Sequence, residues 1–406
     1  MCRGRTWLLL MSVSFFVFFP RDIYALDMRT SILNEDQNEI RIAIFQDLSE
    51  FDISVRGKYK VLDAVTGKVL AEEWNLRDTA VKILPQQIKG IQIGLKNYGA
   101  DKITIVPESD AAIYINKRRF RGAMNIVRGP DQKLSVVNVI GLEEYIKGVL
   151  YHEVSHRWPM EALKAQAVAA RSYALYRMQT SADKNFDVTN DIYSQVYGGK
   201  TSERYRTNLA VERTRHEVLI YQGKILPAYF HATCAGHTED ASELWKEDLP
   251  PLKGVSCPYC IHSPHYNWKH NFRSQDIQDK LNANGFNIGL IKEITIIERN
   301  KSGRIRQLLI TDRDGKNTTI SGKDFRNTIG PNFIRSNNYE IVMQGYYFDL
   351  IGLGWGHGVG LCQWGADEMA RRHYSYVEIL RFYYPGAKIA DISYVDLDKN
   401  KMFLRK

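Results

Sequence analysis

Glu153 stands between two histidines in the segment LYHEVSHRWP, residues 150–159, which joins two predicted helices. A glutamate at such a junction is partly shielded from water, which raises its pKa toward the range useful for proton transfer. A surface glutamate paired with Arg157 is one alternative. His152, Glu153 and His156 also match the His-Glu-x-x-His spacing of zinc peptidases, but that motif needs one unbroken helix and Pro159 follows three residues later. The residues alone leave these three interpretations open.

A second group of residues has the chemistry of a metal site. The segments FHATCAGH and CPYC supply thiol and imidazole groups at two places in the chain: His231, Cys234, His237, Cys257 and Cys260. Such ligands suit tetrahedral zinc. The predicted ligands of a structural zinc are, in chain order, His231, Cys234, Cys257 and Cys260. His237 and Cys362 are the other candidates for the fourth position, and disulfide pairing is the alternative to a metal.

Six glycines surround His357 in the segment GLGWGHGVGLCQWGADEMA, residues 352–370. Glycine permits close approach of the backbone and unusual dihedral angles, and this density is not what a packed core would use. A phosphate-binding loop is a poor match, because no Gly-Lys-Ser/Thr follows. We predict that His357 and Gln363 line the same cleft as Glu153, with Trp355 or Trp364 beside them.

Several elements must position these residues. Short alternating or apolar runs separated by turn residues predict β-strands from Glu39 to about Val137. From Gly141 the pattern becomes helical, and a second helix is expected from near Pro159 to about Met178, with a stripe of small residues that lets another element approach. Later segments alternate strands and helices. The predicted fold class is therefore α+β, a β-rich N-terminal region followed by a mixed α/β domain with a helix-and-strand insertion.

The N-terminus and the net charge indicate where the chain acts. Arg3 and Arg5 precede an apolar run at residues 8–19, and Ala25 offers a cleavage position, which predicts a secretory signal, with an uncleaved anchor as the alternative. We expect an exported protein of the periplasm or cell surface. The net charge of +9 is spread without a long Lys/Arg run, which argues against a nucleic-acid partner. It suits an anionic polymer or a membrane surface, and a charge without a specific partner is the alternative.

Taken together, these motifs resemble the SpoIID family, the stage II sporulation protein D group of peptidoglycan enzymes. The matching segments include VVNVIGLEEYIKGVLYHEVSHRWPMEALKAQAVAARSYAL, DIYSQVYGG, AYFHATCAGHTEDASELW and GWGHGVGLCQWGADEMA, and they cover most of residues 119–386. The expected organisation is a signal or anchor (1–25), a β-rich region (26–118), a catalytic domain (119–390) with an inserted α/β segment (265–345), and a tail (391–406).

The resemblance implies a lytic transglycosylase that cleaves denuded glycan strands between N-acetylmuramic acid and N-acetylglucosamine, leaving 1,6-anhydro ends. The family's catalytic glutamate falls on Glu153. The residues expected to bind substrate are Arg157, Lys164, Arg171, Tyr197, His357 and Gln363, and for Arg171 pairing with a carboxylate is the alternative. The implied partners are peptidoglycan and a wall amidase. A non-enzymatic enhancer of amidases and a zinc peptidase acting on stem peptides are the competing functions. Sporulation, division and general wall remodelling are equally compatible settings.

Overall fold

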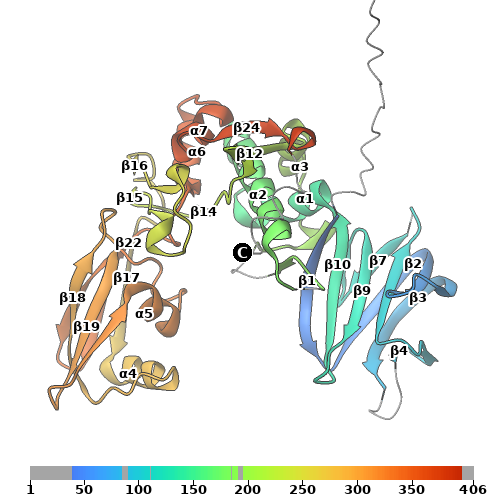
Figure 1. Cartoon of the computed structure of the whole chain (residues 1–406), viewed down its shortest axis with the longest axis horizontal. Helices are drawn as coiled ribbons and strands as arrows, with labels where there is room; N and C mark the ends of the chain where they lie inside the picture. The colour runs from blue at the N-terminus through green and yellow to red at the C-terminus, as the bar shows by residue number, and fades with distance from the viewer. Residues whose placement is uncertain (1–38, 85–89, 110, 184, 191–194, 396–406) are drawn as a thin grey trace, which may run out of the picture. The chain divides into compact units, whose positions relative to one another are not determined.

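The computed structural model describes residues 39–395, apart from 85–89, 110, 184 and 191–194. It confirms the predicted α+β class, because a large N-terminal sheet is followed by helices and shorter strands (Figure 1). The predicted signal or anchor at residues 1–25 and most of the tail at 391–406 lie outside the described residues. No helix in the described part of the chain combines the length and apolarity that a membrane crossing needs.

Eleven strands form the N-terminal sheet. Ten of them follow one another along the chain: β1 (Glu39–Leu48), β2 (Glu50–Asp63), β3 (Val69–Ile83), β4 (Ile91–Ile93), β5 (Lys96–Asn97), β6 (Lys102–Pro107), β7 (Ala112–Ile115), β8 (Arg118–Phe120), β9 (Ala123–Arg128) and β10 (Leu134–Gly141). β1 pairs antiparallel with β10, and β11 (Val188–Thr189) extends the sheet in parallel beside β1. The strands end with β10 at Gly141, close to the predicted end of the β pattern near Val137.

Two helices follow the sheet, and Glu153 lies at the junction between them. α1 (Leu142–Glu153) begins directly after β10 and ends at Glu153, because Val154 takes an extended conformation. α2 (Met160–Thr180) begins behind Pro159, close to the predicted start. Its small side chains are fully buried, as the stripe of alanines predicted: Ala165, Ala167, Ala169, Ala170 and Ala174. Close packing around α2 thus holds the end of α1 in place.

Short elements complete this domain: η2 (Gly199–Ser202), α3 (Tyr205–Arg213), β12 (Glu217–Tyr221), β13 (Lys224–Ile225), β14 (Phe230–His231), β15 (Gly236–His237), η3 (Ala241–Glu243), η4 (Pro250–Leu252), β16 (Ser256–Cys257), β23 (Leu361–Cys362), α6 (Gln363–Arg371), α7 (Tyr376–Tyr383), β24 (Lys388–Asp391) and η5 (Ile392–Tyr394). β14 pairs in parallel with β23, which places His231 opposite Cys362. A capping box between Ser375 and Glu378 starts α7.

We call residues 267–353 the inserted lobe. It contains β17 (Asn267–Arg273), α4 (Ser274–Ala283), β18 (Ile291–Arg299), β19 (Ile305–Asp312), β20 (Asn317–Ser321), α5 (Gly322–Ile329), β21 (Tyr339–Gln344) and β22 (Tyr347–Leu353). The predicted succession of three strands joined by Ser-Gly and Asp-Gly turns, then a short helix, matches β18 to α5. The lobe has its own hydrophobic core between Trp268 and Leu350, close to the insertion predicted over 265–345.

Candidate active site

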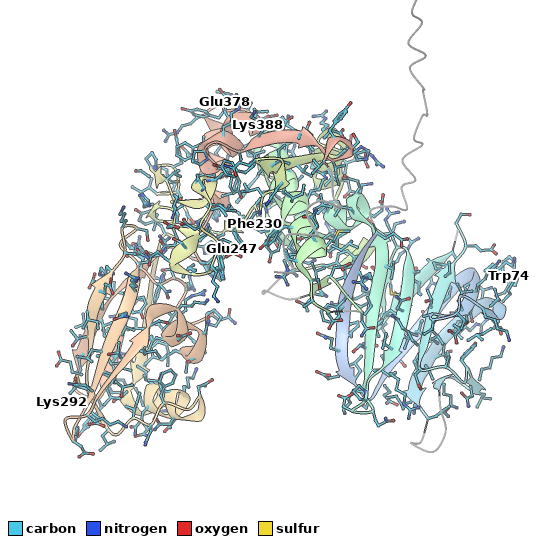
Figure 2. The ribbon with its side chains drawn as sticks, in the orientation of Figure 1. Trp74, Phe230, Glu247, Lys292, Glu378 and Lys388 are labelled. Carbon is cyan, nitrogen blue, oxygen red and sulfur yellow. The ribbon has the colours of Figure 1, made fainter. Side chains whose placement is uncertain are left out.

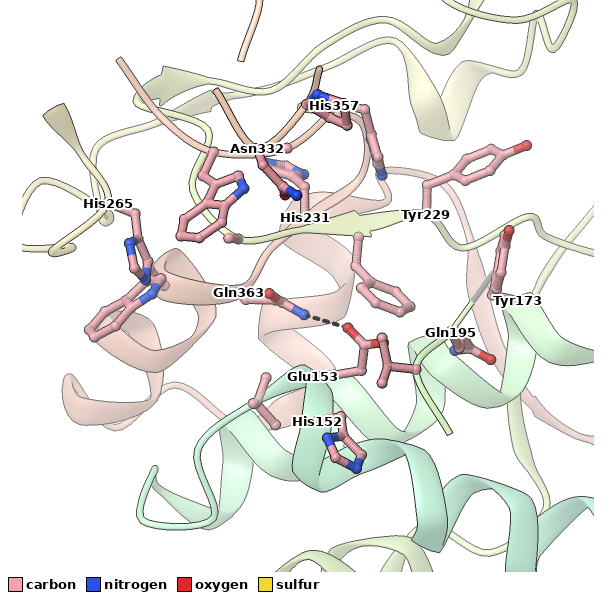
Figure 3. A pocket seen from close by; sticks show the side chains of 18 of the residues that line it. His152, Glu153, Tyr173, Gln195, Tyr229, His231, His265, Asn332, His357 and Gln363 are labelled. Atoms are coloured by element: carbon pink, nitrogen blue, oxygen red, sulfur yellow. Dashed lines mark hydrogen bonds between the residues drawn. The ribbon is translucent and has the colours of Figure 1, made fainter. Parts of the chain in front are cut away.

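A pocket of about 980 Å³ lies between the end of α1, residues 229–232, the inserted lobe and the start of α6. Glu153, His357 and Gln363 all line it, so the structure brings together the three residues that the sequence placed in one cleft (Figure 3). Their segments lie far apart in the chain. The pocket is therefore a product of the tertiary fold.

Glu153 is the last residue of α1 and points into the pocket (Figure 3). Protein atoms surround its side chain closely, and this burial raises its pKa to about 7, although a hydrogen bond from Gln363 and a backbone hydrogen bond at Val196 favour the charged form. The C-terminal end of a helix also disfavours a carboxylate there. Near neutral pH, Glu153 can both hold and release a proton, as an acid–base catalyst must.

Gln363 is the first residue of α6 and lies opposite Glu153. Its Nε2 atom donates to Oε2 of Glu153 across 3.5 Å, a long hydrogen bond between residues 210 positions apart. The contact orients the carboxyl group. The residue before it, Cys362, belongs to β23, so the position of Gln363 depends on that strand.

Glu153 is the one carboxylic acid among the described residues that line the pocket. The rest of the lining consists of aromatic, histidine, amide, basic and apolar side chains, with one serine hydroxyl at Ser155. A two-carboxylate glycoside hydrolase would need a second acid on the other side of the scissile bond. The described lining instead suits a reaction in which one group gives and takes the proton.

The backbone of Val359 holds both histidines of the pocket. Its carbonyl oxygen accepts a hydrogen bond from Nδ1 of His231 at 3.0 Å, and its N–H donates to Nδ1 of His357 at 3.0 Å. Burial lowers the pKa of His357 to about 3 and lowers the pKa of His231 well below its usual value. Both rings are therefore neutral at pH 7, and their opposite hydrogen-bond roles at Nδ1 give them opposite tautomers.

The glycine-rich loop packs against residues 229–235, which corrects the expectation that its glycines are unsuited to packing. An added Cβ on Gly354 would lie 2.6 Å from the Thr233 carbonyl oxygen, and one on Gly356 would lie 2.7 Å from Cβ of His231. Both glycines also have positive φ, at 80° and 110°. Only glycine allows the loop to lie this close to β14 and thereby seat His357 in the pocket.

Aromatic rings meet in pairs around the pocket. The ring pairs among its lining residues include Tyr229–Trp245 (4.3 Å between centroids), His265–Trp355 (4.6 Å) and Trp158–Trp364 (5.2 Å). Both tryptophans that the sequence placed beside His357 and Gln363, Trp355 and Trp364, thus line the pocket. Flat amphipathic rings of this kind suit the apolar faces of sugars while leaving polar edges for hydroxyl groups.

Arg171 does not reach the pocket, which corrects its assignment to substrate binding. Its side chain is fully buried and holds Glu143 through two hydrogen bonds of 2.8 and 2.7 Å. It also donates to the carbonyl oxygens of Glu217 and Val211. The alternative interpretation, pairing with a carboxylate, is what the structure shows.

Three further predicted substrate residues also lie outside the pocket lining. Tyr197 is buried and donates to Asn138 at 2.8 Å, so it is a packing residue. Lys164 pairs with Glu161 at 2.6 Å. Arg157 is exposed in the turn after α1. Closeness to Glu153 in sequence favoured Arg157 and Lys164, but it does not decide which side chains face the pocket.

The structure does not provide the unbroken helix that the zinc-peptidase interpretation requires. α1 ends at Glu153, so His152 and His156 do not share a helical face. Nε2 of His152 lies 2.6 Å from Oγ of Ser202, and the ring of His156 lies against that of Tyr151. Among the described residues, no group of candidate metal ligands includes His152 or His156.

The inserted lobe supplies pocket residues that the sequence analysis missed. Lys323, Arg326 and Asn327 line the pocket from α5, and Asn332 follows in the next loop. Their i, i+3, i+4 spacing places the first three on one face of the helix. That pattern was visible in the sequence, but a polar helical face is indistinguishable from a solvated one until the fold shows what it faces.

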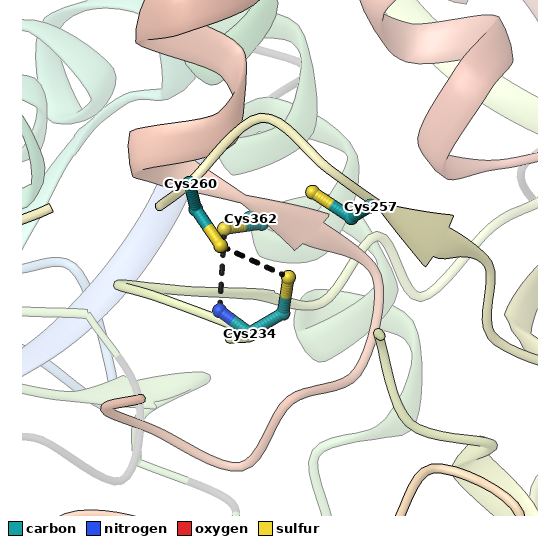
Figure 4. A group of neighbouring side chains, drawn as sticks. All are labelled: Cys234, Cys257, Cys260 and Cys362. Atoms are coloured by element: carbon teal, nitrogen blue, oxygen red, sulfur yellow. Dashed lines mark hydrogen bonds between the residues drawn. The ribbon is translucent and has the colours of Figure 1, made fainter. Parts of the chain in front are cut away.

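Four buried thiols meet at one point beside the pocket: Cys234, Cys257, Cys260 and Cys362 (Figure 4). Their sulfur atoms all lie within 4.8 Å of one another. His231, the predicted fourth ligand, lies outside this group, and its place is taken by the reserve candidate Cys362. The register of β14 and β23 explains the exchange, because it brings Cys362 beside the loop that carries Cys234.

Comparisons with known proteins identify the family. The chain is 35% identical over 362 residues to an uncharacterized protein of Brachyspira hyodysenteriae, covering 89% of this chain and 95% of that protein. It is 31% identical over 321 residues to the stage II sporulation protein D of Bacillus subtilis, covering 74% of this chain and 90% of that protein. The chain belongs to the SpoIID family.

Other matches divide the SpoIID-family chain into two parts. The family model for the stage II sporulation protein matches residues 130–221, which include α1, α2 and Glu153. A separate model, a domain of unknown function, matches residues 260–360, which contain the inserted lobe. A Bacillus subtilis protein named amidase enhancer is 26% identical over 399 residues, covering 86% of this chain and 55% of that protein.

Proposed function

We propose that this chain is a lytic transglycosylase of the bacterial cell wall, which cleaves glycan strands between N-acetylmuramic acid and N-acetylglucosamine. The observation that carries the proposal is Glu153, a single carboxylic acid with a pKa of about 7 among the described lining residues of a pocket rich in aromatic rings. Membership of the SpoIID family supports a role at the cell wall, since relatives are named for sporulation and for enhancing an amidase.

The proposed reaction needs one protein group. Protonated Glu153 gives its proton to the glycosidic oxygen as the bond from that oxygen to C1 of muramic acid breaks. The 6-hydroxyl of the same sugar then bonds to C1, and the Glu153 carboxylate takes the hydroxyl proton. Water is not consumed, the product carries a 1,6-anhydro end, and Glu153 returns to its protonated form.

We propose that the preferred substrate is glycan stripped of its stem peptides, as an amidase would leave it. Each stripped muramic acid carries a free lactyl carboxylate. Lys323 and Arg326 place positive charge on the pocket wall formed by the inserted lobe. The partner implied is a wall amidase acting upstream, and the place of action is the periplasm or the cell surface.

The competing function is that of a glycan-binding enhancer of amidases, which the relative of that name suggests. A protein that only binds glycan does not require a glutamate whose pKa lies near neutral pH. The raised pKa of Glu153 therefore favours catalysis over binding alone.

The test is digestion of amidase-treated glycan by the wild type and by Glu153→Gln, with products identified by mass spectrometry. We expect 1,6-anhydro products from the wild type and a rate about 10²- to 10⁴-fold lower for the variant, because general acid–base catalysis contributes about that much. Circular dichroism checks that the variant is folded. Undiminished cleavage by folded Glu153→Gln would reject the assignment, and glycan binding without cleavage by the wild type would favour the enhancer.

A further inference from the structure

We infer that the inserted lobe carries a second sugar-binding subsite, which holds the stripped glycan strand beyond the pocket and binds a lactyl carboxylate through Arg335. The subsite, called the rim strip, consists of His270, Lys280, Phe333 and Arg335. The inference rests on the proposed function, because its ligand is the same glycan strand. It extends that function to the next sugars along the strand and gives the inserted lobe a role in recognising them.

The rim strip begins at the pocket wall. The centre of the Arg335 guanidinium lies 4.8 Å from the centroid of the Trp355 ring. Trp355 lines the pocket, as does its ring partner His265 (Figure 3). The backbone N–H of Gly356 donates to the carbonyl oxygen of Arg335 at 2.9 Å, so the glycine-rich loop also holds the backbone of this residue. Arg335 is therefore fixed at the edge of the pocket.

Arg335 has the geometry of a carboxylate receptor. A guanidinium that stacks on an aromatic ring keeps its N–H edge available for a bidentate contact with a carboxylate. Among the described residues, the guanidinium of Arg335 lies against the Trp355 ring and pairs with no carboxylate. The side chain is partly exposed. Its positive charge is thus left for a ligand.

The strip continues from Arg335 along the lobe. The ring centroids of His270 and Phe333 lie 5.1 Å apart, and Nζ of Lys280 lies 4.6 Å from the centroid of the same phenylalanine ring. Burial lowers the pKa of His270, and the positive charges of Lys280 and Arg335 lower it further. The four side chains are therefore neighbours, and both charges that act on His270 are positive.

Phe333 gives the strip a surface for a sugar ring. Ile334 is fully buried and anchors the segment, whereas Phe333 before it is 44% exposed. Lys280 is tethered beside the ring, because its Nζ donates to the carbonyl oxygen of Ile329 at 2.6 Å. Asn332, the residue before Phe333, lines the pocket. An exposed ring that continues the pocket wall suits a further sugar of the strand bound in the pocket.

A stripped glycan strand matches both features of the strip. Its sugars have apolar faces, and each muramic acid carries a free lactyl carboxylate, so rings and negative charges recur along the strand. Phe333 offers contact to a ring, while Arg335 and Lys280 offer positive charge. A strand that keeps its stem peptides has an uncharged amide in place of each lactyl carboxylate. The strip should therefore favour stripped strands.

The first experiment measures binding in the full chain carrying Glu153→Gln, which leaves the strands intact. The probes are amidase-stripped strands and the same strands with their carboxyl groups reduced to alcohols. Adding Arg335→Gln should weaken binding of stripped strands by about three- to tenfold, because a bidentate charged contact is lost, and leave binding of reduced strands unchanged. Unchanged binding of stripped strands, or equal losses on both probes, would overturn carboxylate recognition by Arg335.

The matched control for this experiment is Arg313→Gln. Arg313 also lies against an aromatic ring of the inserted lobe, 5.6 Å from the centroid of Tyr346, but it is outside the pocket lining. Its variant should bind both probes as the parent does. A loss in Arg313→Gln as large as that in Arg335→Gln would show that any positive charge on the lobe has the same effect, and would overturn the subsite.

The second experiment tests the ring and the length of the ligand. Phe333→Leu in the same background should weaken binding of long strands by about two- to fivefold, whether or not their carboxyl groups are reduced, and should not affect a disaccharide. Trp74→Leu removes an exposed ring of the N-terminal sheet and is the control (Figure 2). Equal losses on the disaccharide and on long strands would overturn the subsite. Circular dichroism checks that each variant is folded.

The outcomes separate this inference from glycan cleavage. Binding that depends on Arg335 and Phe333, in a protein whose wild type does not cleave, would support the rim strip and reject the proposed activity. Cleavage by the wild type, with strand binding that is indifferent to both residues, would overturn the strip alone. A larger loss in Arg335→Gln on strands that keep their stem peptides would assign the strip to peptides and overturn recognition of the lactyl carboxylate.

Discussion

The chemistry of Glu153 depends on which groups surround a single carboxyl. Burial raises its pKa to about 7, while the hydrogen bond from Gln363 acts in the opposite direction. In the proposed reaction, the carboxyl must be protonated to serve as the acid, and its conjugate base must then accept the hydroxyl proton. Both events are accessible near neutral pH because burial outweighs the hydrogen bonds and raises the pKa to about 7.

The pH dependence of cleavage should report this pKa. Cleavage should fall as the pH rises through about 7, because the acid form of Glu153 is lost. Gln363→Leu removes a hydrogen bond that favours the carboxylate, so the pKa rises and the alkaline limb should move to higher pH. Rates across the pH range for the wild type, Gln363→Leu and the pocket control Asn332→Ala measure the shift. A limb that stays fixed or moves to lower pH in Gln363→Leu contradicts the assignment.

Stability should depend on the same group. Because its folded pKa of about 7 exceeds the usual value of 4.5, the folded state holds a proton that the unfolded state loses between those values. The free energy of unfolding therefore falls as the pH rises through this window, by at most about 3 kcal/mol. Glu153→Gln removes the free-energy cost of burying a charged carboxylate at high pH. The variant should therefore be more stable than the wild type at pH 8 but not at pH 4.5. Urea unfolding at both pH values measures this difference. Equal stability of the two proteins at pH 8 would show that the folded state does not raise the pKa of Glu153.

At the scale of elements, a buried ion pair joins α1 to α2. Arg171 on α2 holds Glu143 on α1, and Glu143 also accepts from the backbone N–H of His216 at 3.2 Å. The pair fixes the base of α1, whose other end carries Glu153. The role of Arg171 is thus to hold the scaffold.

Arg171→Met should lower the free energy of unfolding by about 3–5 kcal/mol, because it leaves Glu143 buried without its partner. Adding Glu143→Leu should recover most of this loss, since both charges are then gone. Denaturant unfolding of the single and double variants gives the comparison. Glycan affinity per folded molecule should stay unchanged. Weaker glycan binding with unchanged stability would restore the substrate-binding interpretation of Arg171.

At the scale of the whole molecule, charge should govern which glycan is preferred. The chain carries a net charge of +9, and stripped strands are regular polyanions. Attraction between exposed charges is screened beyond about 8 Å at physiological salt. Two residues of the inserted lobe, Lys323 and Arg326, bring this charge to the pocket wall.

We therefore expect amidase-treated sacculi to be cleaved faster than untreated sacculi, with an advantage that shrinks as salt rises. Lys323→Gln should weaken binding of stripped glycan by about two- to fivefold, the range of an exposed charge pair. Lys292→Gln, an exposed lysine elsewhere on the lobe, is the matched control (Figure 2). Equal rates on both substrates, or indifference to salt, would mean that the carboxylates are not recognised.

Local patterns in the sequence determined the elements, the family and the identity of Glu153. Periodicity predicts the strands, α1 and α2 because side-chain burial repeats with backbone geometry. Proton-transfer chemistry and the motif around Glu153 singled out that residue before any contact was known. Glycine spacing around His357 likewise marked a loop that approaches another segment closely, though not the segment it packs against.

Only the tertiary structure decided which residues meet. Arg171 is close to Glu153 in sequence yet buried against Glu143, whereas Lys323 is far along the chain yet lines the same pocket. Cys362 replaced His231 among the clustered thiols because strand register brought its sulfur to the other three. Closeness in sequence determines the spatial distance between two residues only when they are a few positions apart. The pocket instead depends on packing between segments that no local pattern relates.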